Sequence, residues 1–501
     1  MRVLLSDGLH FSKKNFASLL CYLDETGAVI TYPEFKNDSI CRFGDYSRWP
    51  GILATGHAMS NLTADELFNC TYKNINLFEV ARAELMSKCA VQEHWLNAPG
   101  YGSSVRALFD KLFVNDNEDL RLNIASARYW AEYWFNLLSS KTFDAVFIFS
   151  GALTYATALT EVMKCFPGRV YVFESFFTGR HYYCEEKYTH LPNNTDARFR
   201  HLLISGTPSG TVIDQARLEY GIKNALAIQN KNVSQPASLK GRLFTNGKQT
   251  VLIGGQVLND FSLLKTTRTG IHSVSVYRSV IERLLAETSV NIIFKAHPWE
   301  NKKNNLFTAK TRMCIEHHFG NCSRVAIVED YAVSDLFSEV DYVFVINSQL
   351  GIEAALHGFK PLQMGSAFYG QYGFTWDVDS PGDVVTLIKN QSGGRLSVQE
   401  YITFREYMMY MLVDWLVPED ETTGKVRLRQ IFKVRPVKKA VSPVKEDSAS
   451  TGGNRNVPTE KTHQTGTWHP VIRKMIKLRR EPKRFLSDSS YSILRVMSKI
   501  L

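Results

Sequence analysis

The chain has 501 residues, of which 44% are hydrophobic and 12% aromatic, enough for two or three domains of roughly 100–200 residues each. No stretch approaches the ~18 apolar residues of a membrane span, and residues 1–6 are too short an apolar run for a signal peptide. The formal charge is +10, but an excess of basic residues in 468–501 leaves only about +3 for the rest of the chain. We therefore expect a cytoplasmic or membrane-peripheral protein without a nucleic acid partner.

The eight cysteines form neither a CxxC pair nor an even ladder along the chain. This spacing indicates free thiols in a reducing compartment, because a disulfide framework or a zinc site needs paired or clustered cysteines. We expect no metal ion.

The first unit, residues 1–235, has a mixed α/β pattern. The apolar run 145–149 predicts a buried strand, 152–165 has helical spacing, and 169–173 predicts the next strand. That strand ends on Glu174. In open α/β sheets, loops at the carboxyl ends of strands bind the ligands, so Glu174 is a candidate functional residue; a solvated loop Glu is the alternative.

A second α/β unit, residues 236–395, follows a polar connection. Its apolar runs predict strands, and helical spacing separates several of them. The expected strands are 249–253, 290–294, 325–328 and 342–346, and the expected helices are 273–288 and 333–339. Two such units predict an α/β fold of two Rossmann-like domains that face a cleft.

Three further segments follow the second unit. Residues 396–435 are expected to form C-terminal helices that pack back on the core, beginning with an aromatic-rich helix over 397–416. Residues 436–467 are too polar to pack and predict a disordered linker. Residues 468–501 mix aromatic, aliphatic and basic residues, which is typical of an amphipathic segment at a membrane surface; a solvated or partner-binding helix is the alternative.

The most informative segment follows the strand expected over 342–346. Asn347 and Ser348 begin a polar turn, in which Ser348 can cap the next helix and Gly351 lets a ligand approach the backbone. Glu353 lies one helical turn further on and could meet ribose hydroxyls. Because a helix start offers free N–H groups, the segment predicts a phosphate or nucleotide site; a capped structural helix is the alternative.

Two more strand ends of the second unit carry polar residues. The strand over 249–253 is followed by Gln256 and Asp260, and the strand over 290–294 by Lys295, His297 and Pro298. Asp260 and Glu174 could face each other across the cleft and divide nucleophile and acid/base roles. The alternatives are a helix-capping Asp260 and a partly buried His297 in an ordinary turn.

The order of these motifs resembles the bacterial capsule and lipopolysaccharide β-Kdo transferases, the Kps-type capsule synthesis proteins and their O-antigen relatives. In this chain the motifs are Gly255-Gln256-Val257-Leu258-Asn259-Asp260, Lys295-Ala296-His297-Pro298, the segment from Asn347 to Pro361, and Gly365-Ser366-Ala367-Phe368-Tyr369 with Gly373-Phe374-Thr375. The resemblance covers roughly residues 251–375. It implies a GT-B-type glycosyltransferase that retains anomeric configuration and uses CMP-β-Kdo as donor, without a metal.

The resemblance also implies roles for individual residues. Asp260 would be the nucleophile, Glu174 the acid/base and His297 the contact to the CMP phosphate. Donor binding would involve Asn347 and Ser348, together with Gln256, Lys295, Pro298, Gly351 and Glu353. The loop after Glu174 departs from the family pattern, which weakens that match. The acceptor would be a lipid-linked glycan at the inner face of the bacterial inner membrane, which the basic tail would bind.

Two other functions remain open. One is a transferase for CMP-sialic acid or another nonulosonate, and the other is a non-catalytic subunit for polysaccharide assembly. Asp377-Val378-Asp379 is formally a DxD motif, which binds a divalent ion in another glycosyltransferase class. Because it follows the family's Gly-x-Thr segment, we expect it to have a structural role.

Overall fold

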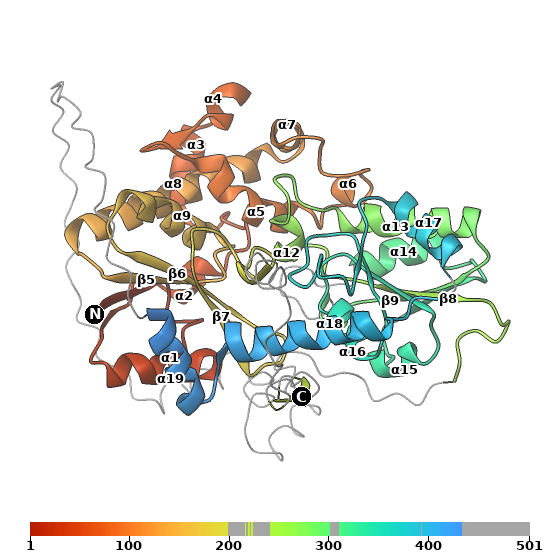
Figure 1. Ribbon diagram of the computed structural model, residues 1–501. Coiled ribbons are helices and arrows are strands. Elements are labelled where there is room, and N and C mark those ends of the chain that lie inside the picture. Colours follow the sequence, from red (N-terminus) through yellow and green to blue (C-terminus); the bar gives the residue numbers. More distant parts are fainter. Residues whose placement is uncertain are drawn as a thin grey trace, which may run out of the picture. The chain divides into compact units, whose positions relative to one another are not determined.

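The computed structural model describes residues 1–198, 241–300, 310–391 and 393–432, together with Ala216, Glu219, Tyr220, Ile222 and Lys223. The described part of Met1–Ser442 forms one compact unit with two six-stranded sheets (Figure 1). The predicted α/β class with two largely parallel sheets is therefore confirmed. The expected linker, 436–467, and tail, 468–501, lie outside the described residues.

The first sheet has the strand order β14-β7-β6-β5-β1-β2. The strands β6, β5, β1 and β2 are parallel, whereas β7 and β14 are antiparallel to their neighbours. The carboxyl ends of β6, β5 and β1 therefore lie side by side at one edge. The strands are β1 (Arg2–Leu5), β2 (Val29–Thr31), β5 (Ala145–Phe149), β6 (Arg169–Ser175), β7 (His181–Glu186) and β14 (Val417–Pro418).

The second sheet has the order β10-β9-β8-β11-β12-β13, and all its neighbouring strands are parallel. Its central strands are buried along their whole length, as expected for a parallel sheet covered on both faces. The strands are β8 (Thr250–Gly254), β9 (Asn291–Lys295), β10 (Val325–Val328), β11 (Tyr342–Val345), β12 (Leu362–Gln363) and β13 (Trp376–Asp377).

Helices of the first half build a large aromatic core above the first sheet. Trp130 and Trp134 of the long helix α8 are fully buried there, and a small hairpin, β3 (Thr71–Tyr72) and β4 (Ile75–Asn76), lies beside α8. The helices are α1 (Lys13–Glu25), α2 (Asn37–Ile40), α3 (Pro50–Ala58), α4 (Ala64–Phe68), α5 (Leu77–Cys89), α6 (Glu93–Leu96), α7 (Val105–Asn115), α8 (Asn117–Ser140), α9 (Thr154–Val162) and the 3-10 helix η1 (Met163–Cys165).

The second half carries most of the remaining described helices. Ser397 caps α18 in a capping box, and the helix continues as the π-helical turn η3, so the helix expected over 397–416 is present but changes type. The elements are α12 (Phe261–Leu264), α13 (Ser273–Glu287), α14 (Lys310–Phe319), α15 (Val333–Phe337), α16 (Leu350–Leu356), α17 (Pro381–Asn390), α18 (Val398–Met409), η3 (Tyr410–Trp415) and α19 (Glu421–Phe432).

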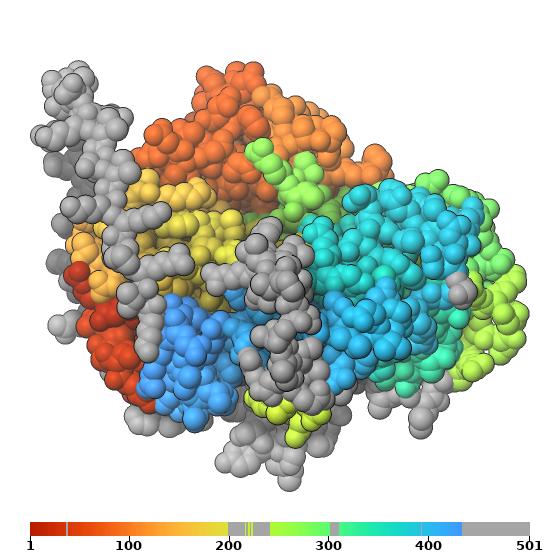
Figure 2. Space-filling view, viewed as in Figure 1, coloured from red at the N-terminus to blue at the C-terminus, as the bar shows by residue number. Residues whose placement is uncertain are grey.

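The end of the described chain returns to the first sheet. Strand β14 pairs with β7, and helix α19 packs against α1. The ring of Phe432 stacks on Phe147 of β5, with centroids 5.4 Å apart. Figure 2 shows this blue segment against the red N-terminal residues. Residues 417–432 therefore stabilise the half of the molecule that contains Glu174.

Candidate functional site

The three predicted loops of the second half follow neighbouring strands. Because β9, β8 and β11 are adjacent in the sheet, the loops that begin at Gly255, Ala296 and Ile346 leave the same edge. Hydrogen bonds also connect two of the loops directly. The side-chain oxygen of Gln256 accepts from the backbone N–H of Asn347 at 3.3 Å.

Asp260 begins the short helix α12. Its Oδ1 accepts a hydrogen bond from the backbone N–H of Ser262 at 2.8 Å. The alternative of a helix-capping aspartate is therefore observed. Capping does not remove the carboxylate from the site, however, because its negative charge still acts on Glu174 in the first half of the molecule.

Glu174 lies near the end of β6. Burial raises its pKa to about 7, opposed by hydrogen bonds from the Ser150 side chain and the Ser175 backbone, and the nearby charge of Asp260 raises it further. The two predicted carboxylates are thus close enough for the charge of Asp260 to act on Glu174. A carboxyl group with a pKa near 7 can both donate and accept a proton at neutral pH.

Asn347 is a structural brace. Its side chain is buried, and both amide hydrogens are donated, to the Ser262 carbonyl at 2.9 Å and to Thr266 Oγ1 at 2.6 Å. Its Oδ1 accepts from the backbone N–H of Ser366 at 2.7 Å. The expected donor contact by the Asn347 amide is therefore revised: the side chain fixes the loops around Asp260.

Gln256 has a similar position. It is buried, and its Nε2 donates to Ser262 Oγ at 2.6 Å while its oxygen accepts from Asn347. Both Gln256 and Asn347 therefore hold the start of α12, which carries Asp260.

Lys295 also differs from the expectation. Its side chain is 4% exposed, and Nζ donates to the backbone carbonyl of Glu329 at 2.5 Å. Burial lowers the pKa of this ammonium group. Because Nζ donates to the carbonyl of the residue that follows β10, Lys295 supports the end of the sheet. The structure therefore does not place this side chain as a contact to the sugar-nucleotide donor.

His297 and Pro298 are half-buried in the turn after β9. His297 Nδ1 accepts from the backbone N–H of Trp299 at 3.1 Å. In a neutral ring the proton is therefore on Nε2, and this nitrogen can act as a hydrogen-bond donor. This is the form that suits a phosphate oxygen.

Helix α16 begins one residue later than the sequence predicted. The N-cap position of α16 is Gln349, although Ser348 Oγ still accepts from the N–H of Leu350 at 3.2 Å. A Cβ at Gly351 would lie 2.2 Å from the hydroxyl of Tyr369, which donates to the Ser348 carbonyl at 2.5 Å. Gly351 is thus required for the packing of Tyr369 and leaves no open approach for a ligand at that point.

Glu353 is half-buried one turn into α16. Burial raises its pKa to about 7, and within the described ranges its carboxylate makes no hydrogen bond. Its charge acts on Tyr369, which places it beside Ser348. This position fits a group that accepts hydrogen bonds from ligand hydroxyls.

The sequence interpretation missed two residues of the first half, Asp7 and His10. They follow β1, whose end is next to the end of β5 in the sheet, and the charge of His10 lowers the pKa of Glu174. The signal was a Ser-Asp-Gly-Leu-His sequence directly after the first apolar run, which is the same strand-end pattern used for the other loops.

Asp377 of the formal DxD motif braces its own loop, as expected. Its Oδ2 accepts from the backbone N–H of Gln371 at 3.0 Å and from Thr375 Oγ1 at 2.9 Å. Among the described residues, no cluster of three His, Cys, Asp or Glu side chains is arranged to hold a metal ion. None of the eight cysteines, all of which lie within these residues, forms a disulfide.

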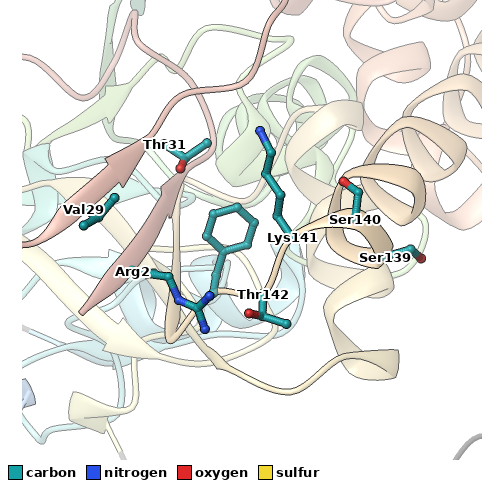
Figure 3. Close-up of a pocket in the computed structure, with 8 residues that line it drawn as sticks. Arg2, Val29, Thr31, Ser139, Ser140, Lys141 and Thr142 are labelled. Atoms are coloured by element: carbon teal, nitrogen blue, oxygen red, sulfur yellow. The ribbon is translucent and has the colours of Figure 1, made fainter.

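A pocket of about 360 Å³ lies at the opposite edge of the first sheet (Figure 3). It is between the amino ends of β1 and β2 and the segment that leads from α8 into β5. Ligands of open α/β sheets bind at carboxyl ends, so this pocket does not belong to the candidate site. Its lining residues are Arg2, Val29, Thr31, Ser139, Ser140, Lys141, Thr142 and Phe143.

Among the helices within the described residues, none is both long and apolar enough to cross a bilayer.

The chain is similar to several known proteins. The lipopolysaccharide-processing protein LpsZ of Rhizobium meliloti is 26% identical over 174 residues, which are 35% of this chain but only 37% of LpsZ. Two solved structures are also similar: the β-Kdo 2,4-transferase KpsC of Thermosulfurimonas dismutans (TM-score 0.39, 17% identity, 58% of this chain and 87% of that one) and the UDP-GlcNAc 2-epimerase of Methanocaldococcus jannaschii (TM-score 0.31, 11% identity, 86% and 99%). Residues 212–386 match the family model of the capsule polysaccharide biosynthesis proteins, which is the family that the motifs of this segment resemble.

Proposed function

We propose that the chain is a glycosyltransferase that moves Kdo from CMP-β-Kdo to a lipid-linked glycan in capsule or lipopolysaccharide synthesis. The observation that carries this proposal is the pairing of Glu174 and Asp260, since the charge of Asp260 raises the pKa of Glu174. The family match over residues 212–386, which include Asp260, supports a role in capsule polysaccharide synthesis.

Two carboxylates suit a double displacement. Kdo has a fully substituted anomeric carbon that bears a carboxylate, and departure of CMP develops oxocarbenium character there. Asp260 attacks this carbon as CMP leaves, which forms a covalent ester. An acceptor hydroxyl then displaces Asp260 while Glu174 takes the hydroxyl proton, so two inversions give net retention.

The neighbouring groups fit the donor side of this reaction. His297, in the tautomer that protonates Nε2, and the Ser348 hydroxyl would balance charge that grows on the leaving phosphate. Glu353 would accept hydrogen bonds from the ribose. The role of Gln256, Asn347 and Lys295 is to hold these loops in place, and no step requires a metal.

A lipid-linked acceptor requires the enzyme to work at a membrane surface. We place it on the inner face of the inner membrane, where its basic segment, residues 468–501, carries nine Lys and Arg against two acidic residues. Each cation near an anionic surface contributes about 1 kcal/mol.

The test is to incubate the full chain with CMP-Kdo and follow its intact mass. A Kdo-sized mass increase that is absent in Asp260→Asn supports the proposal, and Asn retains helix capping at this position. Asp420→Asn is a matched control, because Asp420 also accepts a backbone hydrogen bond at a helix start, from Thr423 at 2.9 Å. It should form the adduct normally.

The same experiment separates the alternatives. An adduct or product from CMP-sialic acid, with none from CMP-Kdo, would favour a transferase for another nonulosonate. If no CMP-sugar is consumed with any acceptor, the proposal fails and a non-catalytic assembly subunit is favoured.

A further inference from the structure

Three adjacent strand ends of the first sheet carry polar groups at the edge that holds Glu174. The order β6-β5-β1 places Glu174 next to Ser150, and Ser150 next to the segment Ser6–His10. Ser6 links the two neighbouring ends, since its backbone N–H donates to the Phe147 carbonyl at 2.8 Å and its hydroxyl accepts from the Phe149 N–H at 3.3 Å. The segment is therefore fixed to the sheet.

Asp7 is a fully buried carboxylate that orients His10. Its Oδ1 accepts from the His10 backbone N–H at 2.7 Å and lies 3.0 Å from His10 Nδ1, while its Oδ2 accepts from Tyr155 Oη at 2.7 Å. Burial alone would raise the pKa of Asp7, but the hydrogen bonds and charge of His10 lower it below its usual value. Asp7 is therefore ionised at neutral pH and accepts a hydrogen bond from Nδ1.

The ring of His10 is held in a defined position. It stacks on Phe149 at the end of β5, with centroids 4.2 Å apart and an interplanar angle of 4°. Its side chain is 21% exposed. Because Nδ1 donates a hydrogen bond to Asp7, the neutral ring has its lone pair on Nε2. When the ring is protonated, it is close enough to Glu174 to lower the pKa of that carboxyl.

We propose that His10, oriented by Asp7, binds the sugar acceptor beside Glu174 by accepting a hydrogen bond from one of its hydroxyl groups at Nε2. This inference rests on the proposed glycosyl transfer and assigns its acceptor side, which the family match over residues 212–386 does not reach. The class of ligand is a sugar with neighbouring hydroxyls, one held by His10 and the other directed at Glu174.

The group-transfer step is balanced without a further reactant. The reacting hydroxyl gives its proton to the carboxylate of Glu174, and its oxygen forms the bond to the anomeric carbon. The bond between that carbon and Asp260 breaks, and its electron pair returns to the Asp260 carboxylate. His10 gains and loses no proton; it holds the sugar.

A purely structural role would depend on the ring and not on its nitrogen. His10→Phe tests this, because it keeps an aromatic ring against Phe149 but has no acceptor atom. With CMP-Kdo as donor and a synthetic alkyl glycoside of Kdo as acceptor, we expect kcat/KM for the acceptor to fall about tenfold or more, the loss of one hydrogen bond. The ratio of transfer to donor hydrolysis should fall similarly, and His10→Gln, which restores an acceptor oxygen, should recover part of it.

His94→Ala is the matched control. His94 also faces an aspartate, with Nε2 3.2 Å from Asp116 Oδ2, but it lies on α6 and not at a strand end. Transfer by His94→Ala should equal that of the unmodified protein. If His10→Phe transfers as well as the unmodified protein, the inference is overturned while the proposed function stands. If the unmodified protein neither forms an adduct nor hydrolyses CMP-Kdo, the proposed function itself fails.

A second measurement tests the inference without any acceptor present. In ¹⁵N-histidine NMR spectra, with the His10 signal identified by its absence in His10→Phe, His10 should be the Nδ1–H tautomer. Asp7→Asn should shift it toward Nε2–H. An Nε2–H tautomer in the unmodified protein would overturn the inference, because that nitrogen could not accept a hydrogen bond.

Discussion

Replacement of Glu174 by Gln should stabilise the protein at alkaline pH while it strongly reduces transfer. Burial raises the pKa of Glu174 from 4.5 to about 7. Between these two values the folded protein retains a proton that the unfolded chain has lost. The contribution of Glu174 to stability is therefore fully present below pH 4.5 and declines by about 1.4 kcal/mol per pH unit until the pH passes 7.

The magnitude follows from this window. The free energy of unfolding should fall by about 2–3 kcal/mol between pH 5 and pH 8 because of Glu174 alone, and this is an upper limit because the side chain retains some exposure to water. Glutamine has no charge to bury, so the decline is absent in Glu174→Gln. The amide loses part of the hydrogen bonding from Ser150 and Ser175, about 1 kcal/mol per bond, at both pH values alike.

The assay is urea unfolding at pH 5 and pH 8, followed by tryptophan fluorescence. The quantity of interest is the difference in pH dependence between the variant and the unmodified protein, since other titrating groups contribute equally to both. Glu132→Gln, at an exposed position of α8, is the control and should leave the pH dependence unchanged. Transfer by Glu174→Gln should fall by about 10²-fold or more. An identical pH dependence in Glu174→Gln and the unmodified protein would refute the reasoning.

Three further variants test the packing around the site. Gly351→Ala places a Cβ 2.2 Å from Tyr369 Oη and should lower the thermal unfolding temperature by an amount equivalent to about 1–3 kcal/mol, partly restored when Tyr369→Phe is added. Asn347→Ala removes two donated hydrogen bonds and one accepted; denaturant unfolding should show a loss of about 2–4 kcal/mol, together with reduced adduct formation by Asp260. Lys265→Met removes an ammonium whose pKa burial lowers to about 7, so the rise in stability of up to about 3 kcal/mol from pH 7 to pH 10 should be missing from its unfolding curves.

The positions of the strand ends could be predicted from sequence. Apolar runs are bounded sharply where a parallel strand leaves the core, and the runs 145–149 and 325–328 coincide with β5 and β10. Glu174 and Asp260 were found for this reason, since each follows or ends such a run. Strand order, which the sequence does not state, places each of them at the carboxyl edge of its sheet.

The use of each polar atom could not be predicted. Asn347 and Lys295 have side chains typical of a phosphate site, yet their partners, such as Thr266 and Glu329, are far away in the sequence. Periodicity shows which face of an element is buried but not which hydrogen bonds a buried amide or ammonium makes. The function of Gly351 depended in the same way on Tyr369, a residue of a later loop.

The separation of the two carboxylates is set by contacts on both sides of Asp260. Asn259, just before it, donates to the Ser87 carbonyl in α5 at 2.9 Å. Lys265, at the end of α12, donates to the Gly151 carbonyl at 3.0 Å, and Gly151 adjoins the serine that hydrogen-bonds to Glu174. The helix that begins at Asp260 is thus tied to the first half at its start and at its end. Because one of these ties reaches the loop that holds Glu174, a change at Lys265 should alter the alignment of both carboxylates, and activity would then depend on a residue that touches neither substrate.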